Sequence, residues 1–527
     1  MAAFEIRDLS FTYPNETAPA LRHIRMDIPE GKITLICGAS GSGKSTLLRR
    51  LKTCLADHGE AEGEVLFFGK PLGEVAQAEQ ARRIGFVFQH PDDQIVTDKV
   101  FHELAFGPES LGWDQRKMRL AVAEMASYFG LSELFMKNVS ELSGGQKQLV
   151  NLASVAVMRP DVLILDEPTS RLDPIAASDF LAALRKLNED LGLTIVLTEH
   201  RLDEALPMAD MLAVLDNGRL IAYDEPRKAA MQIKDSAAFE SMPSAVRIFA
   251  ALGGEGDAPL TVSEGRAFIA SRAQKPVDIM HNSWHTPGDL AVEIKNCWFR
   301  YEKNAPDVLR GLELKLYRGE LCALLGGNGS GKSTSVGLIS GRLKPYRGRV
   351  KGNGAHIAAL PQDPRELFVK DTVSDELAEL GSNEAETARL VKLLELEGIL
   401  GRHPFDISGG EQQRLALGKV LLTHPDVLLL DEPTKGMDGQ LKSRLGELLL
   451  KLRNDGKTVF LVSHDVEFCA RYADRCALLF RGEAVTEGVP SEFFSGNYFY
   501  TTAAAKLSRG MLDGAVLAEE VVECLKR

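Results

Sequence analysis

The sequence predicts an α/β protein in which one mainly parallel domain occurs twice, and three repeated patterns support this fold class. The pattern G-x-x-x-x-G-K-[ST] occurs at 38–45 and 326–333, each time after an apolar run typical of a buried strand. Four apolar residues followed by Asp-Glu occur at 162–167 and 427–432, as expected of a central parallel strand. A Ser-Gly-Gly sequence lies between these patterns in both halves. Because the order is the same twice, we interpret the halves as copies of one domain.

The composition excludes several classes of protein. The 527 residues, 44% of them hydrophobic and 26% charged, predict two or three globular domains. A net charge of −12 argues against broad, non-specific nucleic-acid binding. Seven cysteines without a C-x-x-C pair are typical of reduced thiols in a cytosolic protein. No signal pattern or bilayer-length apolar segment is present, so we expect any membrane role to come through a partner.

Short alternating runs between residues 4 and 36 predict a small antiparallel sheet beside the first glycine-rich segment. Tyr13 and Tyr301 occupy matched positions in the two halves, the same distance before the lysine of that segment. Each aromatic ring is a candidate for stacking on a purine base, with a core tyrosine as the alternative. The matched spacing favours stacking.

The glycine-rich segments predict two nucleoside triphosphate sites. Their glycines allow successive backbone N–H groups to point inward around phosphate oxygens, and the following helix adds its positive N-terminal end. Lys44 and Lys332 are expected to reach the β- and γ-phosphates, and Ser45 and Ser333 to ligate Mg²⁺. The segments consist of Gly38, Ala39, Ser40, Gly41, Ser42, Gly43, Lys44, Ser45 and Thr46, and of Gly326, Gly327, Asn328, Gly329, Ser330, Gly331, Lys332, Ser333 and Thr334.

A glutamine follows a later strand in each half: Gln89 in the first and Gln362 in the second. Each precedes a proline-containing loop and a helical stretch, which predicts a helical subdomain. The side-chain amide is a candidate contact to Mg²⁺ or to the attacking water, and it would relay the occupancy of the site to whatever touches the loop.

The Ser-Gly-Gly sequences are candidates for a second anion-binding device. A helix that opens there offers free backbone amides, a hydroxyl and its dipole to an anion, although an isolated Ser also serves simply as a helix N-cap. The residues are Ser143, Gly144, Gly145 and Gln146 in the first half, and Ser408, Gly409, Gly410 and Glu411 in the second.

The acidic pairs complete the predicted chemistry. Asp166 and Asp431 follow central strands, at the sheet edge where α/β folds bind ligands, and we expect them to hold Mg²⁺ through water. Glu167 and Glu432 are the candidate general bases for in-line attack of water on the γ-phosphate. Asp173 and Asp438 follow the acidic pairs and are further candidate site residues. His200 and His464 follow the next strand, and each is a candidate to hydrogen-bond the γ-phosphate and orient the water.

These motifs divide the chain at 1–226 and 290–490, two domains with a mainly parallel sheet core, a small antiparallel sheet and a helical subdomain each. Residues 227–289 are predicted to form an extension and linker with helical pieces. Residues 491–527 are predicted to form a helical extension with an apolar-periodic helix from Leu512 to Leu525. Packing and stabilisation of a dimer of the two domains remain alternative roles for both extensions.

This order of motifs resembles that of the ATP-binding-cassette (ABC) ATPases over nearly the whole chain. In that family two cassettes face head to tail, so the resemblance implies that each ATP lies between one phosphate loop and the opposite Ser-Gly-Gly. One site would then combine Tyr13, Lys44, Ser45, Gln89, Asp166, Glu167 and His200 with Ser408, Gly409, Gly410 and Asp438. The other would combine Tyr301, Lys332, Ser333, Gln362, Asp431, Glu432 and His464 with Ser143, Gly144, Gly145 and Asp173.

The segment from Phe88 to Val96, followed by 103–109, resembles the ATPase subunits of energy-coupling-factor (ECF) importers of vitamins and metals, and 360–373 resembles the second cassette of fused ECF ATPases. The resemblance implies peripheral attachment at the cytoplasmic face of the cell membrane. The implied partners are an integral scaffold subunit, contacted beside Gln89 and Gln362, and a small substrate-binding membrane subunit.

Two other functions remain open. A sugar-importer ATPase is also a tandem fusion, but its second phosphate loop is commonly degenerate, whereas 326–334 is intact. A tandem ABC protein that acts on ribosomes or DNA typically has a long, charged linker, whereas 227–289 has balanced charge with Pro and Gly. The sequence does not indicate the transported solute.

Overall fold

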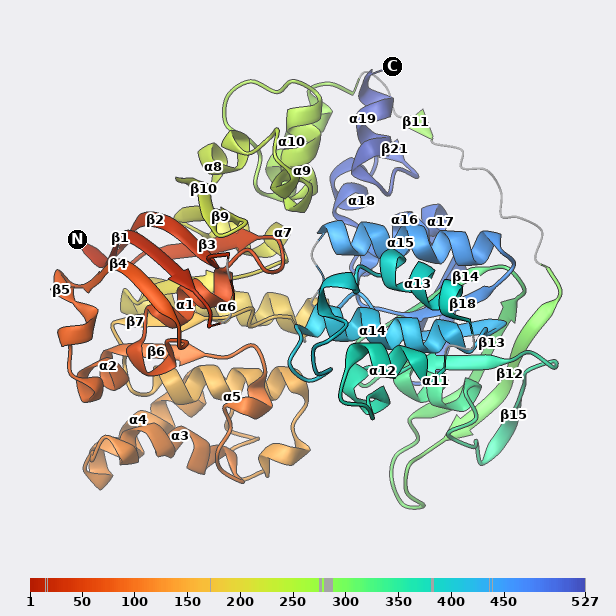
Figure 1. Cartoon of the computed structure of the whole chain (residues 1–527), viewed down its shortest axis with the longest axis horizontal. Coiled ribbons are helices and arrows are strands. Elements are labelled where there is room, and N and C mark those ends of the chain that lie inside the picture. The colour runs from red at the N-terminus through yellow and green to blue at the C-terminus, as the bar shows by residue number, and fades with distance from the viewer. Residues whose placement is uncertain are drawn as a thin grey trace. The chain divides into compact units, whose positions relative to one another are not determined.

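Each half of the chain folds around a six-stranded, mainly parallel sheet, in the strand orders β10-β9-β3-β8-β7-β6 and β16-β17-β18-β14-β19-β20. The computed structural model (Figure 1) describes residues 1–14, 16, 18–170, 172–273, 277–278, 288–380, 383–435, 437 and 439–526. It divides into two units, Met1–Ser271 and Arg272–Arg527. The predicted fold class of two tandem domains is confirmed.

The central strands of the two sheets are short and buried, as their continuous apolar runs predicted, whereas the edge strands β10 and β20 are more exposed. Only the last strand of each sheet, β10 and β20, is antiparallel to its neighbour. The first sheet contains β3 (Ile33–Gly38), β6 (Ile84–Val87), β7 (Val162–Leu165), β8 (Thr194–Thr198), β9 (Met211–Asp216) and β10 (Arg219–Asp224). The second contains β14 (Leu321–Leu325), β16 (Ile357–Leu360), β17 (Val427–Asp431), β18 (Thr458–Val462), β19 (Arg475–Phe480) and β20 (Glu483–Gly488).

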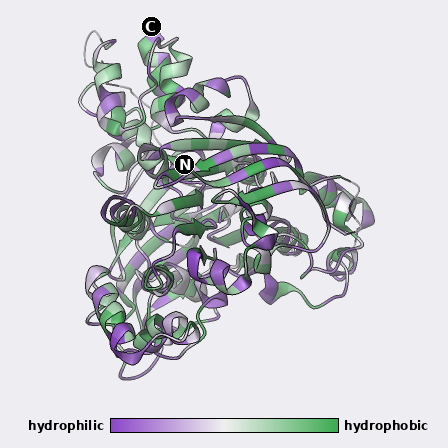
Figure 2. Ribbon diagram, turned by 90° about the vertical axis from the view of Figure 1, so that its left-hand side faces the viewer, coloured by the Kyte–Doolittle hydropathy of each residue, from purple (hydrophilic) through white to green (hydrophobic). Residues whose placement is uncertain are grey.

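Each unit also contains a smaller antiparallel sheet, as predicted for both domains. Its long strands alternate buried and exposed residues, and this alternation is visible as bands of colour in Figure 2. In the first unit the strands are β1 (Ala2–Thr12), β2 (Leu21–Pro29), β4 (Glu60–Phe67) and β5 (Lys70–Pro71). In the second they are β12 (Leu290–Phe299), β13 (Leu309–Tyr317) and β15 (Arg347–Lys351).

Helices cover the central sheets, and in each unit a group of them forms the helical subdomain that follows the glutamine loop (Figure 1). In the first unit the helices are α1 (Lys44–Arg50), α2 (Gln77–Arg83), α3 (Val100–Ser110), α4 (Gln115–Tyr128), α5 (Gly144–Ala156), α6 (Pro174–Leu191) and α7 (Leu202–Ala205). In the second they are α11 (Lys332–Ile339), α12 (Val373–Ala378), α13 (Glu384–Leu393), α14 (Gly409–Leu422), α15 (Gly439–Asn454) and α16 (Val466–Tyr472).

Each unit ends in a group of short helices. After β10 come α8 (Pro226–Gln232), α9 (Ser244–Ala251) and α10 (Val262–Ala270), and apolar residues of this segment, such as Val246 and Phe249, join the core of the first unit. After β20 come α17 (Pro490–Gly496), α18 (Ala503–Ser508) and α19 (Ala518–Lys526). Among the helices that the structure describes, none is long and apolar enough to cross a membrane.

The prediction of a helix from Leu512 to Leu525 is wrong for its first part. Leu512 and Asp513 form a two-residue strand, β21, parallel to β11 (Val277–Asp278), and the helix α19 begins only at Ala518. Gly514 has a φ of +90°, a left-handed conformation that breaks a helical path. The apolar spacing across this point therefore reflects burial of residues in two different elements.

Candidate active sites

Both phosphate loops hold a buried lysine folded back over the loop. Lys44 Nζ donates hydrogen bonds to the carbonyl oxygens of Gly38 and Ala39, at 3.0 Å each. Lys332 Nζ makes the same bonds, at 2.9 Å each, to Gly326 and Gly327. The residues are 5% and 6% exposed. The two loops therefore place one cation each at the start of α1 and α11.

The loop backbone leaves no room for side chains at two of its glycines. A Cβ at Gly38 would lie 2.0 Å from the carbonyl oxygen of Leu215, and one at Gly326 would lie 2.4 Å from that of Leu479. The buried hydroxyls of Ser42 and Ser330 have no hydrogen-bond partner among the residues that the structure describes. Unpaired buried donors beside a lysine and a helix N-terminus fit phosphate oxygens.

A carboxylate and a hydroxyl meet at the end of β7. Asp166 Oδ1 accepts hydrogen bonds from Ser45 Oγ at 3.0 Å and from Thr198 Oγ1 at 2.9 Å. Burial raises the pKa of Asp166 and of its counterpart Asp431, despite the lowering by the serine hydroxyls. A bound cation would offset this cost of burying the charge. These oxygen donors fit the preference of Mg²⁺.

The two candidate general bases share an unusual backbone conformation. Glu167 has a φ of +42° and Glu432 a φ of +53°, in the left-handed region, and each precedes a proline. A non-glycine residue in this region is strained, and such strain is concentrated at functional sites. The same strain at matched positions indicates that both glutamates are held in one required orientation.

The surroundings of Glu167 favour its charged form. Its Oε1 lies 2.8 Å from His200 Nε2 and 3.9 Å from Lys44 Nζ, and its Oε2 accepts a hydrogen bond from Gln89 Nε2 at 2.9 Å. Burial acts to raise the pKa of Glu167, but the hydrogen bond and charge of His200, together with Lys44, lower it below its ordinary value. This carboxylate is therefore ionised at neutral pH.

Glu432 has a different balance of charges. His464 contacts it twice, through its backbone N–H to Oε2 at 3.2 Å and through Nε2 to Oε1 at 3.1 Å. Burial is the largest influence and raises the pKa of Glu432 to about 7, while Lys332 acts in the opposite direction. The two halves thus contain matched glutamates with different proton affinities.

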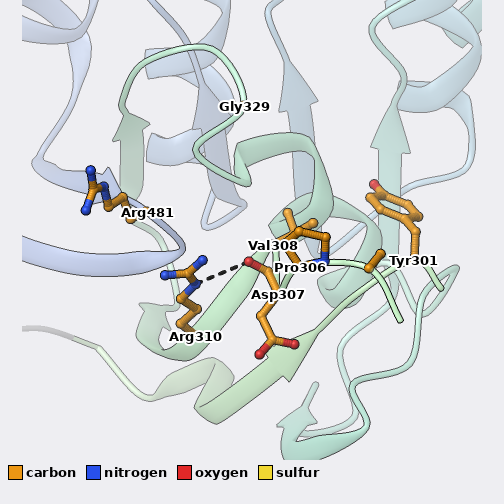
Figure 3. Close-up of a pocket in the computed structure, with 8 residues that line it drawn as sticks. Tyr301, Pro306, Asp307, Val308, Arg310, Gly329 and Arg481 are labelled. Carbon is orange, nitrogen blue, oxygen red and sulfur yellow. Dashed lines mark hydrogen bonds between the residues drawn. The ribbon is translucent and has the colours of Figure 1, made fainter. Parts of the chain in front are cut away.

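Tyr301 lines a pocket of about 530 Å³ beside the second phosphate loop. Figure 3 shows its ring on one side of the pocket, Arg310 and Arg481 on the other, and Gly329 of the loop above. The Tyr301 hydroxyl lies 3.1 Å from Thr334 Oγ1, and the residue is 64% exposed. An exposed ring at this place is available for stacking.

Tyr13 is held more firmly than Tyr301. Its hydroxyl lies 2.8 Å from Thr46 Oγ1 and donates to Asp57 Oδ2 at 2.9 Å, and its ring packs edge-on against Phe11. When the two halves are aligned on Lys44 and Lys332, the residue that corresponds to Asp57 in the second half is Pro345. The second tyrosine therefore lacks this carboxylate partner.

Each Ser-Gly-Gly sequence opens a helix, as predicted, and its serine is the N-cap of that helix. Ser143 and Gln146 form a capping box at the start of α5, and Ser408 and Glu411 form one at the start of α14. Gly144 and Gly409 have open space where a Cβ would be. Asp173 caps α6 by accepting from the N–H groups of Ile175 and Ala176. Asp438 lies outside the described residues.

A family model for the ABC transporter family matches residues 21–170 and 309–435, which together are more than half of the chain and include both phosphate loops and both acidic pairs. The chain belongs to the ABC transporter family. Its two units are therefore ABC cassettes with ABC-type ATPase domains, and the sequence-based identification of the family and of the ATPase activity is confirmed.

Relatives of similar length share the whole tandem arrangement. An ABC transporter ATP-binding protein of Bacillus thuringiensis subsp. konkukian (strain 97-27) is 41% identical over 547 residues, covering 99% of this chain and 98% of the relative. Another from Streptomyces coelicolor is 34% identical and covers 96% and 97%. The solved structure of RNase-L Inhibitor has a TM-score of 0.60 at 20% identity, covering 98% of both chains, which shows a shared fold. The structure of cbiO1 from Clostridium perfringens, part of the ABC transporter complex cbiONQ, is 30% identical and covers 46% of this chain and 97% of its own, with a TM-score of 0.40.

Sequence reasoning missed two residues that support the first cassette's acidic pair. Thr198 Oγ1 accepts from the backbone N–H of Glu167 at 2.9 Å, in addition to its bond to Asp166. Glu199, which is buried, accepts from the N–H of Thr169 at 3.0 Å. The second cassette has Val462 and Ser463 ahead of its histidine, where the first has Thr and Glu. A comparison of the two halves at these positions would have been the signal in the sequence that points to Thr198 and Glu199.

We expect the two cassettes to differ in the pH dependence of hydrolysis. In Glu167→Gln only Glu432 remains as a candidate base, and a protonated carboxyl cannot accept a proton. The ATPase rate of this variant should therefore decrease below about pH 7, with a limiting slope of about tenfold per pH unit. In Glu432→Gln the rate should stay level from about pH 6 to 8, since the pKa of Glu167 is lowered. Steady-state rates at saturating Mg-ATP test this, and identical profiles would contradict it.

Tyr301→Ala is expected to weaken ATP binding at the second site by about 5- to 150-fold, because base–aromatic stacking contributes roughly 1–3 kcal/mol per base. Calorimetric titration with a non-hydrolysable ATP analogue, in a Lys44→Ala background that weakens the first site, measures the loss. Tyr301→Phe keeps the ring and should bind as the parent does. Equal affinity of the Ala and Phe variants would show that the ring does not stack.

Proposed function

We propose that this ABC protein is the ATP-hydrolysing motor of an ECF-type importer of a vitamin or metal ion. The observation that supports this best is the pair of glutamine loops, whose sequences resemble those of ECF ATPases and which present apolar side chains to solvent. Val96 is 66% exposed in the first loop and Val369 is 71% exposed in the second. Phe106, on α3 behind the first loop, is 43% exposed. Exposed apolar side chains at matched places mark a contact for a partner.

The first glutamine loop is connected to the catalytic centre of its cassette. Gln89 donates to the candidate base Glu167, and Gln94, five residues along the loop, accepts from the N–H of Phe88 at 3.0 Å and donates to the carbonyl of Phe86 at 3.2 Å. A partner that moves the first loop would therefore act on β6, which ends two residues before Gln89. In this proposal the membrane subunits bind at the two loops, and the protein is peripheral to the cytoplasmic face of the membrane.

Within this function, we infer that the two cassettes pair head to tail. Each ATP would lie between one cassette's phosphate loop and the other's Ser-Gly-Gly, in the two combinations of residues given by the sequence. Lys44 and Ser45, or Lys332 and Ser333, would hold the triphosphate and Mg²⁺. The Ser-Gly-Gly amides would share the γ-phosphate charge, which ties the cassettes together until hydrolysis releases them. ATP supplies the phosphoryl group, and the chain's own residues bind it, position water and accept the proton.

Co-purification tests the transport function. The tagged chain is recovered from gently solubilised membranes of its native cells, in parallel with a Val96→Glu/Val369→Glu variant. We expect one multi-span scaffold and one small integral protein with the parent chain and their loss from the variant. Leu120→Glu is the matched control, because Leu120 is 69% exposed and belongs to α4, outside both loops. Recovery of ribosomes or DNA-repair proteins with no membrane protein would contradict the proposal.

A further inference from the structure

The loop after Gln362 is held by a buried carboxylate. Glu376, on α12, is fully buried, and its Oε1 accepts hydrogen bonds from the backbone N–H groups of Val369 and of Lys370, the latter at 2.7 Å. Both residues are exposed in the second loop. A carboxylate that accepts two backbone amides fixes the direction of the chain there.

Lys419 connects this carboxylate to the helix that begins at Ser-Gly-Gly. Lys419 is 6% exposed on α14, the helix capped by Ser408. Its Nζ donates to Glu376 Oε2 and, at 2.7 Å, to the carbonyl oxygen of Leu367. One buried ammonium group therefore joins α14 both to the loop and to the residue that holds the loop.

The first cassette keeps the carboxylate but not the cation. Glu103, 4% exposed on α3, accepts from the N–H of Val96 at 3.1 Å and from the N–H and hydroxyl of Thr97 at 2.9 Å each. Ser154 occupies the place of Lys419 when the halves are aligned on Ser-Gly-Gly, and its hydroxyl bonds the carbonyl of Asn151 within its own helix. No ion pair to Glu103 is formed within the described parts of the chain.

The first cassette instead ties its loop to α5 through amides. Gln148 Nε2 donates to the carbonyl of Phe88 at 3.2 Å, and Asn151 Nδ2 donates to that of Pro91 at 3.1 Å. In the second cassette the counterpart of Asn151 is Ala416. The counterpart of Gln148 is Gln413, whose Nε2 is buried without a partner among the residues described. In the second cassette, Lys419 thus provides the link between α14 and the loop that Gln148 and Asn151 provide between α5 and the loop in the first cassette.

We propose that Lys419 is a positioning residue that transmits the nucleotide-dependent position of α14 to the loop 367–370. A helix moves as a rigid rod, so a shift of its Ser-Gly-Gly end on meeting a γ-phosphate displaces Lys419 with it. The displaced ammonium carries Leu367 and Glu376, and through Glu376 the backbone amides of Val369 and Lys370. This inference rests on the proposed head-to-tail pairing and is independent of the transported solute.

Hydrogen–deuterium exchange of the full-length chain tests the proposal. In a Glu167→Gln/Glu432→Gln background, we expect Mg-ATP to slow exchange at Ser-Gly-Gly (408–411) and to change exchange at 367–370. In Lys419→Met/Glu376→Gln, protection at 408–411 should remain while the ATP-dependent change at 367–370 is lost. This paired variant removes both buried charges together, which avoids the large cost of leaving one unpaired. Lys419→Arg keeps a cation with several donors and should retain the change.

Two controls separate the outcomes. Lys370→Met breaks only the partly exposed Lys370–Glu379 ion pair of 3.3 Å and should retain the ATP-dependent change. The first loop, at 96–97, should respond to ATP equally in all Lys419 variants. An ATP-dependent change at 367–370 that persists in Lys419→Met/Glu376→Gln, or one that Lys419→Arg fails to retain, would overturn the role of Lys419. Absence of ATP protection at 408–411 in the parent background would instead refute the pairing of the cassettes.

Discussion

Glu167→Gln/Glu432→Gln is expected to bind ATP and to hydrolyse it roughly 100- to 10,000-fold more slowly than the parent chain. Glutamine preserves the shape of each side chain, so the contacts from Gln89, His200 and His464 that position it are largely kept. It cannot accept the proton of the attacking water. The γ-phosphate therefore stays in place, and in the paired arrangement the closed, ATP-bound form accumulates.

Single-turnover quench measurements give the rate, and retention of ATP through gel filtration reports the trapped form. Glu189→Gln is the control, since Glu189 is an exposed residue on α6 that pairs with Arg185. Each single Glu→Gln change should slow hydrolysis to a smaller extent than the double change. Undiminished turnover in the double variant would refute the assignment of both glutamates as bases.

Lys44→Ala and Lys332→Ala are each expected to weaken ATP binding at their own site by about 10- to 150-fold. A hydrogen bond to a charged group contributes about 1.5–3 kcal/mol, and in each loop the Nζ points back to the carbonyl oxygens that border the expected phosphate position. The helix N-terminus and the loop amides remain in these variants, so binding is reduced and not abolished.

Equilibrium titration with a non-hydrolysable ATP analogue measures this loss. AMP provides a chemical control, because it lacks the β- and γ-phosphates and should bind the variants as it binds the parent. Lys32→Ala is the matched control for removal of a lysine, since Lys32 forms an exposed ion pair with Asp210. An unchanged ATP affinity in Lys332→Ala would show that the second loop does not bind a triphosphate.

The matched residues of the two cassettes lie in unequal surroundings. Glu167, the candidate base of the first, is contacted by Gln89, His200 and Lys44, and its pKa is lowered. Glu432, the candidate base of the second, has contacts from His464, and burial raises its pKa to about 7. Two sites with intact motifs can therefore work at different rates at one pH, which the single-site pH profiles measure.

The sequence by itself determined the fold class, the family and the ATPase chemistry of this protein. The reason is that the deciding features are local: the glycines that a phosphate loop requires, the apolar run before Asp166 and Asp431, and the serines that cap α5 and α14. Such backbone geometry depends on a few neighbouring residues, and its repetition made chance improbable. The head-to-tail pairing and the individual roles of the site residues stay predictions.

The tertiary structure alone decided which side chains support these motifs. Thr198 and Glu199 reach residues about 30 positions earlier in the chain, and Lys419 reaches Glu376, 43 positions away. The contrast between the pKa values of Glu167 and Glu432 likewise arises from buried neighbours contributed by several strands and loops. Burial and long-range contacts follow from packing and leave no periodic signal in the sequence, so only the folded chain reveals where two copies of one domain differ.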